Sequence, residues 1–125
     1  MSVFSALRRL LQTAALAALI APVHAAGTGL TLTHFNPGDD AIFQVSSVLV
    51  SGQRDAILID AQFGKSQAAK VVDMVRASGK TLTTIYISHG DPDFYFGLDT
   101  VLAAFPDARV VATEPTVQHL SLIHI

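Results

Sequence analysis

Cysteine is absent from the 125-residue sequence, so neither disulfide bonds nor thiolate groups contribute to stability, catalysis or metal binding. Any metal site must therefore use histidine, aspartate or glutamate. The sequence also lacks a Gly-x-Ser-x-Gly motif and a phosphate-binding glycine loop, and so gives no support to a serine hydrolase or a nucleotide-binding enzyme. Only 14% of the residues are charged, without clusters, which argues against nucleic acid or an anionic membrane surface as a partner.

The first 25 residues have the pattern of a secretory signal peptide. Arg8 and Arg9 form a positive region, residues 10–20 form an apolar region, and Ala25 ends a short segment suited to signal peptidase. The apolar region is too short for a membrane-spanning helix, which needs about 20 residues. An uncleaved anchor or an amphipathic helix is the alternative. We therefore expect a periplasmic or secreted protein with no membrane attachment beyond this segment.

Removal of the signal peptide takes away two of the eight basic residues and none of the ten acidic ones, which leaves a net charge of about −4. At the other end, the sequence stops after an apolar tail with no capping residue, charge or turn. We expect that residues 121–125 are not native and that the chain is a fragment of a longer protein. A genuine short protein that ends in an apolar strand is the alternative.

Residues 28–120 predict the element order β-β-β-α-β-α-β-α. Alternating apolar and polar residues predict a strand at 30–35, and a strong turn signal separates it from a second strand at 42–50. A short apolar run at 56–59 predicts a third strand that is buried on both faces. These three strands are expected to form an antiparallel meander.

Helical periodicity begins after the third strand. Apolar residues at helical spacing predict a helix between an N-cap at Ser66 and Gly79, a second helix at 98–105, and a third that starts near residue 114. Strands at 85–87 and 109–112 alternate with these helices. This alternation predicts right-handed crossovers and helices packed on at least one face of the sheet.

The segment after the strand at 85–87 concentrates candidate ligands within five residues. His89, Asp91 and Asp93 follow the strand end directly, and in α/β proteins such strand ends are where ligand-binding groups converge. A histidine and two carboxylates at alternate positions are suited to one divalent ion. The alternative is a structural turn, because Asp-Pro favours turn initiation and Asp93 can cap the helix that follows.

This segment resembles the metal-binding loop of the metallo-β-lactamase superfamily, whose pattern is His-x-His-x-Asp-His followed, after two more residues, by glycine. In this resemblance His89 takes the first histidine, Asp93 takes the aspartate and Gly97 takes the glycine. Asp91 stands at the second histidine and Phe94 at the third. The element order also resembles the first half of the superfamily fold, an α/β (α+β) structure built as a four-layer αββα sandwich.

The resemblance implies a divalent metal, with zinc first and manganese or iron as alternatives, held by His89, Asp91 and Asp93. It implies one ion rather than two, because Phe94 cannot bind a metal. Asp93 is then also the catalytic residue that orients water and accepts its proton, while Asp60 and Gly97 support the loop. The adjacent aromatic residues are candidates for the substrate pocket: Phe94, Tyr95 and Phe96.

The function that we expect is therefore an exported hydrolase in which metal-bound water attacks an ester, lactone, amide or related bond of a small molecule. The alternative is a non-catalytic binding module of the same fold that has lost its metal centre, for which Asp91 and Phe94 are the evidence. As a fragment, the chain is expected to be inactive and to self-associate. His34, on the first strand, is expected to be an exposed structural histidine.

The signal-peptide pattern generates a direct prediction. We expect the mature protein to begin at Ala26, because the small residues that precede it complete the cleavage site. N-terminal sequencing of exported material checks this expectation. An exported protein that still carries Met1 or Ser2 would contradict it.

Overall fold

The structure is a computed structural model that describes residues 29–123. The predictions made for the signal peptide and for His124 and Ile125 lie outside these residues. None of the described helices is long and apolar enough to cross a membrane.

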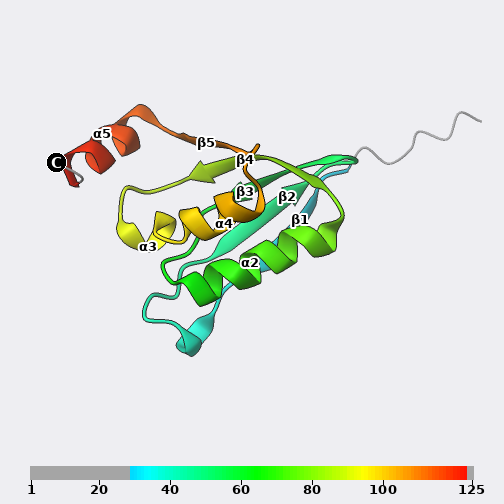
Figure 1. Cartoon of the computed structure of the whole chain (residues 1–125), viewed down its shortest axis with the longest axis horizontal. Coiled ribbons are helices and arrows are strands. Elements are labelled where there is room, and N and C mark those ends of the chain that lie inside the picture. Colours follow the sequence, from blue (N-terminus) through cyan, green and yellow to red (C-terminus); the bar gives the residue numbers. More distant parts are fainter. Residues whose placement is uncertain (1–28, 124–125) are drawn as a thin grey trace, which may run out of the picture.

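The framework is one five-stranded sheet with the strand order β1-β2-β3-β4-β5 (Figure 1). Strands β1 (Thr31–Phe35), β2 (Ser47–Ser51) and β3 (Asp55–Ile59) form an antiparallel meander, as predicted. Strands β4 (Thr81–Ile87) and β5 (Arg109–Ala112) then extend the sheet in parallel to β3. The sheet is therefore mixed, and its parallel part brings the carboxyl ends of β3, β4 and β5 to the same edge.

Two helices form the second layer. Helix α2 (Lys65–Ser78) connects β3 to β4, and α4 (Leu98–Ala104) lies between β4 and β5. Both helices cover the same face of the sheet (Figure 1), because two right-handed crossovers that advance in the same direction place their helices on one side. The remaining elements are η2 (Gly38–Asp40), α3 (Pro92–Tyr95) and α5 (Glu114–Ile123).

The core lies between this helical layer and the sheet. Four apolar residues of α2 recur at helical spacing and are buried, namely Ala68, Val71, Val72 and Val75. The alternate residues of the central strands that face them are buried as well. Together they form one cluster, whose members on these elements are Leu49, Ala56, Leu58, Ala68, Val71, Val72, Val75, Leu82, Ile85, Ile87 and Val101.

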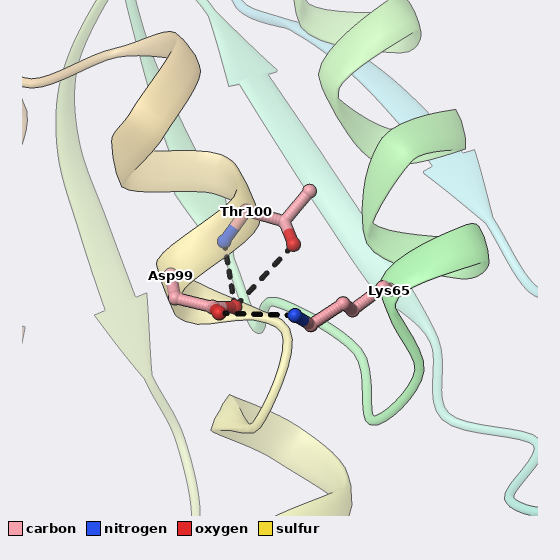
Figure 2. Close-up of polar contacts among 3 residues, drawn as sticks. All are labelled: Lys65, Asp99 and Thr100. Carbon is pink, nitrogen blue, oxygen red and sulfur yellow. Dashed lines mark hydrogen bonds and ion pairs between the residues drawn. The ribbon is translucent and has the colours of Figure 1, made fainter.

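A polar contact joins the first turns of the two covering helices (Figure 2). Lys65 Nζ lies 3.9 Å from Asp99 Oδ2, and the other carboxylate oxygen accepts a 2.7 Å hydrogen bond from the Thr100 N–H. Thr100 Oγ1 also donates to this oxygen, at 3.3 Å. Because both charged side chains are exposed, the pair contributes little to stability. The helical layer therefore depends on apolar packing.

The second face of the sheet is not covered by any described element, whereas the apolar run at 56–59 predicted a strand with both faces buried. Strand β3 is buried on one face only, because Ile57 is 42% exposed while its neighbours Ala56 and Leu58 are buried. Val50 pairs with Ile57 on one side and with Leu32 on the other, so all three side chains share this open face. Leu32 is 69% exposed. The open face is therefore apolar.

Other boundaries also differ from the expectations. The strand expected at 42–50 begins only at Ser47, because the preceding residues form bends beside η2. Gly64, not Ser66, is the N-cap of α2, and it makes no side-chain cap hydrogen bond. Gly79 ends this helix with φ of 66°, and its N–H donates to Arg76 O, as predicted. Strand β4 extends back to Thr81.

The open face predicts self-association of the chain. An uncovered apolar patch on the order of 400 Å² corresponds to about 10 kcal/mol of lost burial, which is comparable with the stability of a typical domain. Replacement of two of its residues, Leu32→Thr with Ile57→Thr, should shift the protein towards monomer, as measured by light scattering after gel filtration.

The control substitution is Ile42→Thr, because Ile42 is 83% exposed in the segment between η2 and β2 rather than on the sheet. It should leave self-association unchanged. A monodisperse monomer with cooperative thermal unfolding, observed for the unsubstituted chain, would contradict this prediction.

Candidate functional site

A buried carboxylate joins the ends of two neighbouring parallel strands. Asp60 directly follows β3, and its backbone N–H donates to Tyr86 O at 2.9 Å. Its side chain accepts two hydrogen bonds from Ser88, which directly follows β4: Oδ1 accepts from the backbone N–H at 2.8 Å and Oδ2 accepts from Oγ at 2.6 Å. Asp60 is 5% exposed. The carboxylate therefore fixes the first residue of the segment that carries the candidate ligands.

The next hydrogen bond in this chain orients His89. Its Nδ1 lies 2.7 Å from Ser88 Oγ, and the hydroxyl proton of Ser88 is already donated to the Asp60 carboxylate. His89 Nδ1 must then be the donor to Ser88, which assigns the Nδ1–H tautomer. In this tautomer Nε2 carries a free lone pair, and the residue is exposed. His89 therefore presents Nε2 as its free ring nitrogen.

Some of the groups around Asp60 raise its pKa and others lower it. Burial raises the pKa above 3.8, whereas the two hydrogen bonds from Ser88 and the proximity of His89 lower it. Asp93 raises it further through like charge. Because burial dominates, the pKa of Asp60 is above its ordinary value.

The three predicted ligands share one segment but do not form a ready-made site. Asp91 is exposed and is the N-cap of α3 without a side-chain cap hydrogen bond, and Asp93 lies in the first turn of that helix. Within residues 29–123 no three histidine, aspartate or glutamate side chains are placed to hold a metal ion together. The donor types fit a divalent cation, and His89 offers a free nitrogen, but the described part of the chain supplies an incomplete ligand set.

The three consecutive aromatic residues of the motif have different neighbours, although the rings of Tyr95 and Phe96 also meet edge to face at 5.3 Å. Phe94 stacks on the His89 ring, with centroids 4.4 Å apart and an interplanar angle of 26°. Phe96 stacks on Phe63 at 5.3 Å, and Tyr95 lines an apolar cavity of about 230 Å³ between β5, α4 and α5. Partial burial and the nearby Asp91 raise the pKa of Tyr95. Phe94 is therefore the aromatic residue that contacts the candidate ligand.

A second aromatic group lies beside the motif and was not expected from the sequence. Phe63 packs edge-on against Phe43 at 4.9 Å and also stacks on Phe96, so the three rings form a continuous row. Phe43 and Phe96 are 44% and 48% exposed. Phe63 lies three residues after Asp60, just beyond the end of β3 and at the same edge of the sheet as the motif. This position after a strand end is the only sequence feature that could have predicted its place beside the site.

Three further residues of the site were also missed. Ser88, Ser47 and Gln62 are ordinary polar residues in the sequence, and only the strand-end position of Ser88 distinguishes it. Their roles depend on hydrogen bonds between residues 13 to 28 positions apart, such as the 2.8 Å bond from Ser47 Oγ to Asp60 O. No local pattern encodes these contacts.

Gly97, the glycine predicted to support the loop, lies where the segment after α3 contacts the turn after β3. Gly97 N–H donates to Gln62 O at 2.8 Å. A Cβ at Gly97 would overlap the Ala61 carbonyl oxygen and lie 2.7 Å from Ala68 Cβ. Only glycine allows the segment after α3 to approach the turn after β3 this closely.

Another glycine of the motif makes a contact with α5. A Cβ at Gly90 would overlap the imidazole of His119 and lie 3.1 Å from its Cβ. His119 therefore packs directly on the backbone of the candidate ligand segment.

Comparisons with known proteins agree with this arrangement. A sequence profile of the metallo-beta-lactamase superfamily matches residues 41–122. Among curated proteins, the uncharacterised protein YobT of Bacillus subtilis (strain 168) is 34% identical over 74 residues, which cover 59% of this chain and 31% of YobT.

Solved structures match as well. A metallo-beta-lactamase from Hirschia baltica superposes with a TM-score of 0.58 at 13% identity, over 77% of this chain and 43% of that chain. A metallo-beta-lactamase with an HARLDQ motif from Cronobacter sakazakii superposes with a TM-score of 0.51 at 28% identity, over 59% of this chain and 29% of that chain. The chain thus spans less than half the length of each of these relatives.

The close approach of backbone segments at Gly97 predicts that one added methyl group lowers the stability of the fold. Gly97→Ala should destabilise monomeric protein by about 1–3 kcal/mol, because the added Cβ meets backbone and helix atoms that cannot move independently. Denaturant unfolding measures the change. Gly52→Ala is the control, because a Cβ there would meet its nearest atom at an ordinary 3.6 Å. Equal stabilities of the two variants would contradict the packing described here.

The raised pKa of Asp60 predicts a pH-dependent stability difference. Asp60 ionises more readily in the unfolded chain, so the protein should lose stability as the pH rises from about 3.8 through the raised folded pKa. Asp60→Asn retains an oxygen that accepts from the Ser88 N–H and gains an amide that donates to Ser88 Oγ. Relative to the parent, this variant should therefore gain stability across that pH range in denaturant titrations. A parallel pH dependence of the two proteins would refute the assignment.

Proposed function

Because the chain belongs to the metallo-beta-lactamase superfamily, we propose that it forms part of a metal-dependent hydrolase that acts on a small molecule. The reaction is the addition of water to an ester, lactone, amide or related bond. A divalent cation, with zinc as the first choice and manganese or iron as alternatives, would supply the positive charge that polarises the water and the scissile bond. The residues of this chain orient the ligands and handle the proton.

The observation that supports this proposal most strongly is the orientation of His89. The hydrogen-bonded series Asp60–Ser88–His89 leaves Nε2 as the free nitrogen of an exposed imidazole. Metal-binding histidines commonly donate their other ring N–H to a carboxylate, a carbonyl or water, which fixes the tautomer. Here the other ring nitrogen, Nδ1, is bonded to the Ser88 hydroxyl, which in turn donates to the Asp60 carboxylate.

Asp91 and Asp93 are the further ligands in this proposal, and Asp93 also orients the water and accepts its proton. The remaining ligands belong to parts of the protein outside residues 29–123. The relative from Cronobacter sakazakii is described by an HARLDQ motif, which has histidine first and aspartate fifth. The segment from His89 to Phe94 keeps these two residues and likewise departs from histidine at the third and sixth positions. Departure at these two positions is therefore compatible with a metallo-beta-lactamase.

Phe94 supports a single ion. Phe94 stands in the sequence where the motif has its third histidine, and its ring packs against His89, so an apolar side chain replaces an imidazole at this position. The exposed row formed by Phe43, Phe63 and Phe96 lies beside it and is suited to an apolar or aromatic part of the substrate.

The second candidate function is a non-catalytic binding module. The same two replacements, Asp91 and Phe94, favour it, because together they remove two imidazole ligands from the motif. In that case the aromatic row would bind a small molecule without hydrolysis. We further propose export to the periplasm or the medium, on the basis of the N-terminal pattern.

Metal content distinguishes the two functions. We expect close to one equivalent of zinc in the full-length protein rather than two, because Phe94 replaces a ligand of the second site. His89→Ala should remove most of this metal and reduce hydrolysis of a panel of lactones and esters at least 100-fold. Elemental analysis and initial rates, with and without chelator, measure both effects.

The control is His34→Ala, because His34 is an exposed histidine on β1 whose Nε2 contacts Ser46 Oγ at 3.0 Å. Strands β2 and β3 separate β1 from β4, which leads into the motif. It should keep both metal and activity. A carefully prepared wild-type protein without metal would reject the hydrolase in favour of the binding module.

A further inference from the structure

Gln62 is buried and conformationally restricted at the edge of the candidate site. Only 1% of its surface is exposed, although glutamine side chains usually lie on protein surfaces. Its φ of 70° lies in the left-handed region, which side chains other than glycine, asparagine and aspartate seldom adopt. Asp60, two residues earlier, has φ of 62°. Such backbone conformations persist where surrounding interactions hold them.

The side chain of Gln62 supplies interactions of this kind. Its Nε2 donates to Val45 O and to Ser47 Oγ, both at 2.8 Å. Ser47 Oγ in turn donates to Asp60 O at 2.8 Å. Since Gln62, Ser47 and Asp60 are all buried, water does not compete for these hydrogen bonds. The carboxamide thereby holds the carbonyl of Asp60 through Ser47.

The main chain of the same turn holds the segment that carries the candidate ligands. Gln62 O accepts from the Gly97 N–H, and the Ala61 N–H donates to Phe94 O, both at 2.8 Å. The turn of residues 60–62 therefore lies between the start of β2 on one side and α3 with its following glycine on the other. A shift of this turn would move Asp60 relative to Ser88.

We propose that Gln62 is a positioning residue for the candidate metal site. It fixes the backbone of Asp60 through Ser47, so that the Asp60 carboxylate meets Ser88 and Ser88 orients His89. The proposal rests on the proposed function, because the orientation of His89 matters for catalysis only if His89 binds a metal. It goes beyond that function in assigning a role to a residue that is remote from the ligands.

The carboxamide is suited to this task for a specific reason. Val45 O can only accept a hydrogen bond, and Ser47 Oγ donates its proton to Asp60 O, so both need a donor. An –NH2 group supplies two donors from one atom. Leucine at this position would leave both acceptors unpaired, and glutamate would place an acceptor against them.

The test compares Gln62→Leu with Gln67→Leu in the full-length protein. Gln67 is the matched control, because it lies in the first turn of α2 and is only partly buried. Its side chain makes two hydrogen bonds, one to Asp40 O at 3.2 Å and one from Ser66 Oγ at 3.0 Å, and neither involves the turn of residues 60–62. Ser47→Ala is a milder second variant that breaks the link to Asp60 O. The readouts are the backbone amide shift of Ser88 in ¹H–¹⁵N spectra without metal, and zinc affinity by chelator competition.

We expect Gln62→Leu to move the Ser88 amide resonance and to weaken zinc binding 10- to 100-fold, the range typical for loss of a residue that orients a ligand. Ser47→Ala should change both readouts in the same direction, and Gln67→Leu should change neither. If Gln62→Leu fails to fold, Ser47→Ala decides the result.

Two outcomes separate the hypotheses. If Gln62→Leu and Ser47→Ala lower the melting temperature but leave the Ser88 amide and the zinc affinity unchanged, the positioning role is refuted. If the wild-type protein binds no zinc, the proposed function fails, and the Ser88 amide still decides whether Gln62 positions Asp60.

Discussion

The two hydrogen bonds from Ser88 to the Asp60 carboxylate are the interaction on which the candidate site depends. They join the carboxyl ends of β3 and β4 at the edge where the parallel part of the sheet exposes its loops. Without them, Ser88 would lose the carboxylate that orients its hydroxyl towards His89. With them, Nδ1 of the imidazole is engaged by Ser88, and Nε2 remains the free nitrogen of an exposed ring.

This arrangement has an energetic cost that the surrounding structure offsets. Asp60 and Gln62 adopt left-handed backbone conformations, which cost about 1–3 kcal/mol each. Burial of the carboxylate adds a desolvation cost, which the hydrogen bonds from Ser88 reduce. The compensation comes from dense polar contacts and from the glycine at position 97, which lets two backbone segments touch. Strain and buried charge at the same turn are typical of sites retained for function rather than stability.

The sequence predicts the order and type of the main elements well, because periodicity is local information. The spacing of Ala68, Val71 and Val75 predicted α2, and the alternation of strands with helices predicted the parallel crossovers. The start of β2 was placed too early because the apolar residues Ile42 and Phe43 continue the apolar pattern, although they belong to an exposed bend before the strand. The burial of β3 on both faces was overestimated, since hydrophobicity does not show which face lacks a covering layer.

The candidate site was predictable only in part. The positions of His89 and Asp93 followed from a motif, whereas Ser47 and Gln62 carry no motif and act through contacts between distant segments. Whether the site binds a metal is tested most directly by anomalous diffraction at the zinc edge from crystals of the full-length protein grown with zinc. The proposed function predicts one anomalous peak at about 2.0–2.1 Å from His89 Nε2, with Nδ1 still bonded to Ser88. A peak at Nδ1, or none beside His89, would contradict the account.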